Sequence, residues 1–128
     1  MARIILAEDD EPLRAGLTLV LESAGHQVEA VPDGSAALDA LNHEMADLVV
    51  TDIRMPQMDG LELLRILREE GPRVPVIVMS GTDPTHRARL FGIAGELGAH
   101  AMLAKPFRAH VLLHAVEICL RRESAEMG

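Results

Sequence analysis

The sequence Val49-Val50-Thr51-Asp52-Ile53-Arg54-Met55-Pro56 joins an apolar, β-prone run to a single carboxylate and then to a loop. The run from Asp47 to Thr51 is typical of a buried strand, and Asp52 stands where that strand ends. Gln57-Met58-Asp59-Gly60 then follows as a loop signal. In open α/β folds, ligands bind at the carboxyl edge of the sheet. The stretch therefore predicts that Asp52 lies at a functional edge.

The bulk composition limits the class of protein. A length of 128 residues predicts one domain, and 48% apolar residues are enough to fill its core. The net charge of −8 disfavours nucleic acid and anionic membranes as partners, and the aromatic content of 2% disfavours base stacking. A single cysteine fits a reducing compartment, and the apolar run at the N-terminus is too short for a signal peptide or a membrane span. We therefore expect a cytoplasmic protein.

Short apolar runs alternate with helical patterns along the chain. Strands are predicted at residues 3–7, 27–31, 47–52, 75–79 and 99–104, and helices at roughly 12–24, 35–43, 59–70, 83–97 and 107–122. Five repeats of strand and helix predict an α/β fold, with a parallel sheet covered by helices on both faces. We expect the domain to span residues 1–122 and residues 123–128 to form a frayed tail.

Three local features refine this pattern. Gly25 is predicted to stop the first helix, and Asp33 is predicted to cap the start of the second. The last helix is predicted to begin near Phe107, with an inward face made of Phe107, Val111, Ala115, Ile118 and Cys119.

Polar side chains occur where the predicted strands end. Glu8 and Asp9 follow the first strand, Asp52 ends the third, Ser80 follows the fourth and Lys105 follows the fifth. Because parallel strands end at the same edge of a sheet, the sequence predicts a pocket with three carboxylates, one hydroxyl and one ammonium.

This combination of groups favours phosphoryl chemistry. Three neighbouring carboxylates repel one another, and a divalent cation removes that penalty. Oxygen ligands favour a hard ion such as Mg²⁺, and the ammonium and hydroxyl suit an anion on its far side. Aspartate is an established covalent acceptor of phosphoryl groups, and Asp52 is the natural nucleophile because it stands alone on the central strand.

Four motifs occur in order at the strand ends. They are Ile5-Leu6-Ala7-Glu8-Asp9-Asp10-Glu11-Pro12-Leu13-Arg14, Asp52-Ile53-Arg54-Met55-Pro56 with Met58-Asp59-Gly60, Val76-Ile77-Val78-Met79-Ser80-Gly81, and Leu97-Gly98-Ala99 with Leu103-Ala104-Lys105-Pro106-Phe107. With these motifs, the chain resembles the receiver domain of two-component response regulators over almost its whole length. The resemblance implies a flavodoxin-like (βα)5 three-layer sandwich with a five-stranded sheet in the order 2-1-3-4-5. It also implies a stand-alone, single-domain member.

The resemblance assigns roles to the acidic residues. It implies that Asp52 takes a phosphoryl group from a histidine kinase or a histidine phosphotransfer protein. Asp9 and Asp52 would bind Mg²⁺ directly and Glu8 through water, and the backbone carbonyl of Arg54 would complete the metal site.

The resemblance also assigns the remaining site residues. Ser80 matches the switch hydroxyl, and Lys105 matches the lysine that pairs with the phosphoryl group. Arg54 and Thr82 match the variable positions that tune how fast the phosphoryl group is lost. Met102 departs from the family, which usually has Tyr or Phe three residues before the lysine, and the segment between Ser80 and Lys105 is slightly longer than expected.

Two other functions stay open. One is a degenerate receiver that acts as a constitutive protein-binding module. The intact set of Asp9, Asp52, Ser80 and Lys105 argues against it, whereas Met102 leaves it open. The other is a Mg²⁺-dependent phosphohydrolase with an aspartyl-phosphate intermediate. Enzymes of the haloacid-dehalogenase type place a second Asp two residues after the nucleophile, where this chain has Arg54.

The expected partners follow from the favoured reading. We expect no enzymatic activity beyond promotion of the protein's own phosphorylation and dephosphorylation. Besides the phosphoryl donor, the expected partner is an unknown output protein, with no nucleic acid and no membrane. Length and net charge disfavour a DNA-binding regulator, and we expect a monomer or a weak dimer.

Overall fold

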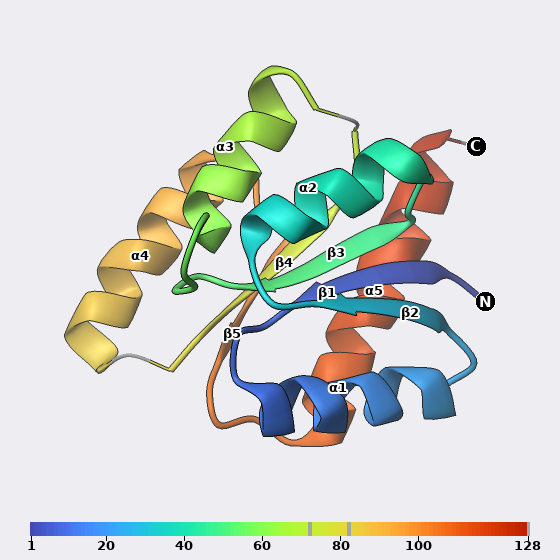
Figure 1. The fold of residues 1–128 in the computed structure, drawn as a ribbon, viewed down its shortest axis with the longest axis horizontal. Coiled ribbons are helices and arrows are strands. Elements are labelled where there is room, and N and C mark those ends of the chain that lie inside the picture. The colour runs from blue at the N-terminus through green and yellow to red at the C-terminus, as the bar shows by residue number, and fades with distance from the viewer. Residues whose placement is uncertain (72, 82, 128) are drawn as a thin grey trace.

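A sheet of parallel strands lies in the middle of the protein, with helices on both of its faces (Figure 1). The structure is a computed structural model that describes residues 1–71, 73–81 and 83–127. Across these ranges the strands are β1 (Arg3–Ala7), β2 (Gln27–Val31), β3 (Leu48–Asp52), β4 (Val76–Ser80) and β5 (Ala101–Ala104). The helices are α1 (Glu11–Ser23), α2 (Gly34–His43), α3 (Gly60–Glu69), α4 (Pro84–Glu96) and α5 (Ala109–Met127).

The sheet has the strand order β2-β1-β3-β4-β5, and each neighbouring pair is parallel. This confirms the predicted order. Every residue of β3 and of β4 is buried, as expected of parallel strands that are covered on both faces. The central strands therefore hold their last residues firmly at the carboxyl edge.

The sheet separates two apolar layers, which makes the fold a three-layer sandwich as predicted. On one face, α1 and α5 pack against alternate residues of β1, with a core that includes Ile4, Leu6, Leu17, Leu21, Leu112 and Val116. On the other face, α2, α3 and α4 cover the sheet, with a core that includes Ile5, Ala37, Leu41, Leu63, Leu64 and Ala94. Figure 1 shows the same division, with α1 and α5 on one side and α2, α3 and α4 on the other.

Side-chain caps define the starts of the helices that follow the sheet edge. The Asp33 carboxylate accepts a hydrogen bond of 2.8 Å from the Ala36 amide, which confirms the predicted cap of α2. Asp59 accepts one of 2.8 Å from the Glu62 amide at the start of α3. Gly25 has a φ of 95° directly after the end of α1, in the region that favours glycine. The predicted stop at Gly25 is thus confirmed.

The predicted inward face of α5 is confirmed at Cys119, and Phe107 and Ala115 also pack on the core, but the prediction is wrong at Val111 and Ile118. Leu112, Val116 and Cys119 are buried, whereas Val111 is 38% exposed and Ile118 is 36% exposed. The prediction set the helical phase from Phe107, but α5 begins at Ala109 and Phe107 packs on the core from the preceding loop. The phase was therefore taken from a residue outside the helix.

The ends of the elements differ from the prediction by a few residues. Strand β5 begins at Ala101 rather than at Ala99, and α5 continues to Met127 rather than ending at Arg122. The division into a domain at residues 1–122 and a frayed tail at 123–128 stays a prediction. Among the described residues, no helix combines the length and the apolar content of a membrane span.

Candidate functional site

Three carboxylates meet at the carboxyl edge of the two central strands. One carboxylate oxygen from each of Glu8, Asp9 and Asp52 lies within 4.8 Å of the others. The pairing of Ala7 with Thr51 places the residues that follow on β1 beside Asp52 at the end of β3. Glu8 and Asp52 are buried, at 1% and 8% exposure, whereas Asp9 is exposed. The predicted acidic cluster is thus assembled by strand register.

The backbone explains why adjacent acids have different surroundings. The Glu8 amide donates a hydrogen bond of 3.0 Å to the Val31 carbonyl, which continues the β1–β2 ladder one residue beyond the strand. Side chains alternate along an extended backbone, so Glu8 points inward and Asp9 points out to solvent. The Asp10 amide donates to Glu8 Oε2 at 3.2 Å and helps to fix the buried carboxylate.

Lys105 links two of the three carboxylates. Its Nζ lies 2.5 Å from Glu8 Oε1 and 2.6 Å from Asp52 Oδ2. The Lys105 side chain is 16% exposed, so both ion pairs are largely shielded from solvent. Its backbone amide donates to the Ser80 carbonyl at 2.8 Å, and the peptide bond to Pro106 is cis. Lys105 was expected to face a phosphoryl group, and its ion pair with Glu8 was not foreseen.

The charges of this cluster shift two pKa values. Burial raises the pKa of the Glu8 carboxyl above its ordinary value of 4.5, and the negative charge of Asp52 acts in the same direction. The hydrogen bond from Lys105 opposes this shift without cancelling it. Burial lowers the pKa of the Lys105 ammonium, but the hydrogen bonds to Asp52 and Glu8, together with the negative charges of these residues, outweigh it and leave the pKa above 10.5. Lys105 is therefore firmly held as a cation.

Ser80 lies at the same edge, as predicted. It is 2% exposed at the end of β4, where it pairs in register with Ala104, next to Lys105. Asp52 pairs with Met79, the residue before Ser80, so the hydroxyl-bearing residue is one position further along the neighbouring strand. The structure therefore brings together Glu8, Asp9, Asp52 and Lys105, with Ser80 beside them.

The loop after β3 and the start of α3 pack closely against the backbone of Asp52. The Arg54 amide donates a hydrogen bond of 3.3 Å to Asp52 Oδ1, and the Arg54 side chain is exposed. The Gly60 amide donates to the Ile53 carbonyl at 2.8 Å, and a Cβ on Gly60 would lie 2.1 Å from the Asp52 carbonyl oxygen. Only glycine permits this approach of the start of α3 to the end of β3.

Of the two remaining predicted positions, Met102 lies apart from this cluster. Met102 is 38% exposed on β5, and its terminal methyl carbon would be 3.9 Å from a Cβ placed on Gly95 of α4. The end of the Met102 side chain thus reaches α4 near Gly95. Thr82 lies outside the described residues.

Arg14 is a site residue to which the sequence assigned no role. Its Nη1 donates a hydrogen bond of 2.8 Å to the Glu8 carbonyl, from the second turn of α1. Asp10 occupies the N-cap position of α1 and makes no side-chain cap hydrogen bond. The Arg14 side chain instead connects this helix to the acidic segment. The signal in the sequence was an arginine within two turns of the acidic pair.

The donor set of the cluster fits a hard divalent cation. Its ligand atoms are carboxylate oxygens, two of the three residues are buried, and the exposed Asp9 leaves one side open to solvent. Such oxygen sets suit Mg²⁺, which keeps part of its water shell. Burial is the main cause of the raised pKa of Glu8, and the negative charge of Asp52 adds to it. A cation bound here would offset the repulsion between these two carboxylates.

Comparison with known proteins agrees with this geometry. The family model described as "Response regulator receiver domain" matches residues 4–117. The response regulator MprA of Mycobacterium sp. (strain KMS) is 37% identical over 126 residues, which cover 98% of this chain and 54% of that protein. This chain therefore spans about half the length of the curated relatives it matches.

Solved structures show the same fold. The Francisella response regulator 1452 receiver domain has a TM-score of 0.85 and 29% identity, over 96% of this chain and 99% of that one. NtrX from Brucella abortus has a TM-score of 0.87 and 29% identity, over 98% of this chain and 29% of that one. Together with the family model and the acidic edge, these matches show that the chain belongs to the response regulator receiver domain family.

Proposed function

We propose that this chain is the phosphoacceptor switch of a two-component phosphorelay, with Asp52 as the acceptor. The observation that carries the proposal is the position of the Asp52 carboxylate at the carboxyl edge of the sheet, 2.6 Å from Lys105 Nζ and within 4.8 Å of two further carboxylates. The donor would be a histidine kinase or a histidine phosphotransfer protein, as for receiver domains in general.

In the transfer step, an Asp52 carboxylate oxygen forms a bond to phosphorus while the P–N bond of the donor phosphohistidine breaks. The bonding electron pair returns to the imidazole nitrogen, which takes up a proton. Lys105 already lies 2.6 Å from Asp52 Oδ2, so its ammonium is placed to pair with an oxygen of the incoming phosphoryl group. Ser80 would then donate its hydroxyl hydrogen to another phosphoryl oxygen.

Mg²⁺ is the cofactor that we assign to the acidic cluster. Asp9, Asp52 and the Arg54 carbonyl would bind it directly, and Glu8 through water. When bound, Mg²⁺ would neutralise charge on the peripheral phosphoryl oxygens. Glu8 keeps its ion pair with Lys105, which holds the ammonium at the edge of the site. Arg54 and Thr82 would set how long the phosphoryl group persists.

The signal would be read on the side of the molecule near β5. A phosphoryl group adds up to about two negative charges at a site that already holds three carboxylates. Movement of Ser80 toward this charge would shift β4 and the segment leading to α4, and Met102 occupies the position that would respond. The readout would be docking of an output protein or onward transfer of the phosphoryl group. We place the protein in the cytoplasm, as a monomer or weak dimer, without nucleic-acid or membrane partners.

One alternative keeps a specific observation in its favour. Met102 is a flexible side chain lying along α4, and it lacks the two defined positions of a ring. A receiver that binds its partner constitutively would need no such ring. A phosphohydrolase has less support, because Arg54 stands where that chemistry places a second Asp. Beyond its own phosphorylation and dephosphorylation, we assign the chain no turnover.

The test is intact mass spectrometry after incubation with acetyl phosphate, with and without Mg²⁺. Wild type is expected to gain one phosphoryl group only when Mg²⁺ is present, and Asp52→Asn is expected to gain none. Asp39→Asn, an equivalent change at an exposed position of α2, is the matched control and should behave as wild type. No adduct in any sample, and no binding of beryllofluoride, would favour the constitutive binding module. Steady hydrolysis of a small phosphoester would favour the phosphohydrolase.

A further inference from the structure

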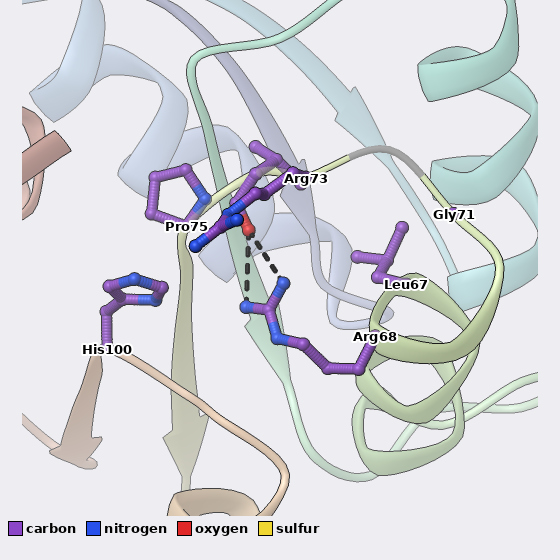
Figure 2. Close-up of a pocket in the computed structure, with 7 residues that line it drawn as sticks. Leu67, Arg68, Gly71, Arg73, Pro75 and His100 are labelled. Atoms are coloured by element: carbon purple, nitrogen blue, oxygen red, sulfur yellow. Dashed lines mark hydrogen bonds between the residues drawn. The ribbon is translucent and has the colours of Figure 1, made fainter. Parts of the chain in front are cut away.

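A pocket of about 330 Å³ lies at the edge of the sheet opposite to the acidic cluster (Figure 2). The C-terminal end of α3 and the segments that lead into β4 and β5 form it. Leu67 and Pro75 supply apolar walls, and the ionisable side chains in its lining are Arg68, Arg73 and His100. None of the described lining residues is acidic, although the chain carries a net charge of −8. The pocket therefore concentrates positive charge in an acidic protein.

Arg68 is held in place by backbone carbonyls. Both of its terminal nitrogens lie 3.3 Å from the Val74 carbonyl oxygen, and Nη2 also donates to the Gly98 carbonyl at 3.2 Å. These bonds fix the guanidinium between α3 and the segments before β4 and β5. Arg68 is thus a preorganised cation at the pocket.

Arg73 approaches the same pocket from the segment before β4. Figure 2 shows its side chain, with those of Arg68 and His100, at the pocket. Within the described part of the chain, Arg73 makes no hydrogen bond or ion pair, and it is exposed. A second guanidinium that shares a pocket with Arg68 is repelled by it unless an anion offsets the two charges. Arg73 therefore has unused donors directed to a site where an anion is favoured.

His100 forms a third polar wall. Its amide donates to the Val76 carbonyl at 2.8 Å, and its Nδ1 lies 3.5 Å from the Val76 amide nitrogen, which donates toward it. This contact anchors the imidazole at the start of β4. The imidazole is thereby held in place as part of the lining of the pocket.

We propose that this pocket binds a small phosphate-bearing anion, with Arg73 as the principal ligand beside Arg68 and His100. Guanidinium groups match the oxygens of phosphate in pairs, and the volume suits a small ligand. The acidic residues at the nearby helix ends, Glu69, Glu70 and Glu96, are exposed. Their charge disfavours an extended polyanion such as nucleic acid and leaves a compact anion as the better fit.

The proposal does not rest on phosphorylation of Asp52, and the experiment separates the two sites. Amide NMR spectra of the ¹⁵N-labelled chain would be recorded in Mg²⁺-free buffer during titration with inorganic phosphate, at constant ionic strength maintained with chloride. We expect saturable shifts at Arg73 and His100 with dissociation in the millimolar range, and separate behaviour of the Lys105 signals at the opposite edge. A parallel titration with glycerol phosphate distinguishes free phosphate from a phosphorylated small molecule as the preferred ligand.

Two variants test the role of Arg73. Arg73→Gln should weaken phosphate binding by about tenfold, because a hydrogen bond to a charged group is lost. Arg65→Gln is the matched control, since Arg65 is an exposed arginine of α3 outside the pocket, and its affinity should equal that of wild type. Equal affinity of both variants, or identical shifts with chloride alone, would overturn the proposal. His100→Gln provides a second variant at the same pocket, with an expected loss of several-fold.

Discussion

All five residues of β3 are buried, whereas in β5 only Leu103 among the four residues is buried. The difference continues in the helices, because α3 buries Gly60, Leu63, Leu64 and Leu67, but α4 buries only Ala94. Asp52, the proposed acceptor, thus stands on the closely packed half of the sheet. The side assigned to readout is loosely packed.

This contrast separates two physical demands. Three carboxylates and one ammonium must be held within a few ångströms of one another, and such positioning needs buried strands and short hydrogen bonds. A readout surface must change shape at low cost, and few buried contacts make local rearrangement easy. A single small domain meets both demands by placing them on two strands of one sheet, β3 and β5, with β4 between them.

The largest expected effect comes from a methyl group added to the packed side. Gly60→Ala places a Cβ 2.1 Å from the Asp52 carbonyl oxygen, and backbone must move to make room. We expect the free energy of unfolding to fall by about 3 kcal/mol. Because the chain has no Trp or Tyr, urea unfolding would be followed by far-ultraviolet circular dichroism.

The matched change lies on the loose side. A Cβ on Gly92 of α4 meets nothing within 4 Å, so Gly92→Ala should raise the free energy of unfolding by about 0.5–1 kcal/mol through helix propensity. Opposite signs for the two substitutions would support the contrast. A similar loss of stability in both would show that α4 is packed as tightly as α3.

The next effect concerns the charges of Glu8, Asp52 and Lys105 at the carboxyl edge of the sheet. Lys105→Met removes the ammonium that lies between Glu8 and Asp52, and leaves two carboxylates in a largely buried site. In Mg²⁺-free buffer at neutral pH, we expect a loss of about 2 kcal/mol, reduced from the fully buried case by the remaining exposure of Lys105. Mg²⁺ should restore more stability to the variant than to wild type, because it offsets the same charge.

A control variant distinguishes this effect from loss of the side chain alone. Arg65→Met removes the exposed ion pair with Glu69, for which we expect a change within about 0.5 kcal/mol. Lys105 is also the only lysine of the sequence, so a lysine-selective ¹³C label yields one signal that reports its titration directly. Comparable losses in both variants would contradict the assigned importance of the buried pairs.

A smaller effect is expected in the pH dependence of stability. The pKa of Glu8 is raised by folding, so the folded chain binds this proton more tightly than the unfolded chain does. Its contribution to stability is fully present below the ordinary value of 4.5 and is lost as pH rises through the raised pKa. In the absence of Mg²⁺, the free energy of unfolding of wild type should therefore fall relative to that of Glu8→Gln as the pH rises. A difference that does not change with pH would show that Glu8 keeps its ordinary pKa.

The residues at the carboxyl edge of the sheet were the part of the site that could be predicted from sequence. Asp52, Ser80 and Lys105 stand at strand ends that apolar runs define, and parallel pairing then brings them to one edge without knowledge of any side-chain conformation. The ion pair between Lys105 and Glu8 joins residues 97 positions apart and depends on side-chain rotamers. No local pattern carries that information, and the same holds for the hydrogen bond from Arg14 to the Glu8 carbonyl.

The prediction of the buried face of α5 is partly wrong for a related reason, because it depends on tertiary packing. The phase of α5 was set by Phe107, which is apolar and packs on the core, although it precedes the helix. On a helix with apolar residues on several sides, periodicity does not distinguish Val111 from Leu112, and tertiary packing decides which is buried. The sequence therefore predicts that α5 is a helix but does not fix which of its apolar residues are buried.

The smallest expected effect on stability tests the readout side. Met102 is 38% exposed, so Met102→Tyr should change the free energy of unfolding by less than about 0.5 kcal/mol and leave acceptance of the phosphoryl group unchanged. The variant would contain the chain's only Tyr, whose fluorescence reports on the surroundings of position 102. If this side has two arrangements, beryllofluoride with Mg²⁺ should change that fluorescence.

Val111→Tyr is the matched control for this last test, since Val111 is also 38% exposed and lies on α5. Its fluorescence should not respond to beryllofluoride. A response in Met102→Tyr alone would show that the loosely packed β5 and α4 change conformation, and that an aromatic ring at position 102 takes part in the change. If the fluorescence of neither variant responds, although Asp52 carries a phosphoryl adduct, the acceptor chemistry and the surface at Met102 are uncoupled. The flexible Met102 would then be a feature of the resting surface, and another face of the domain would carry the signal.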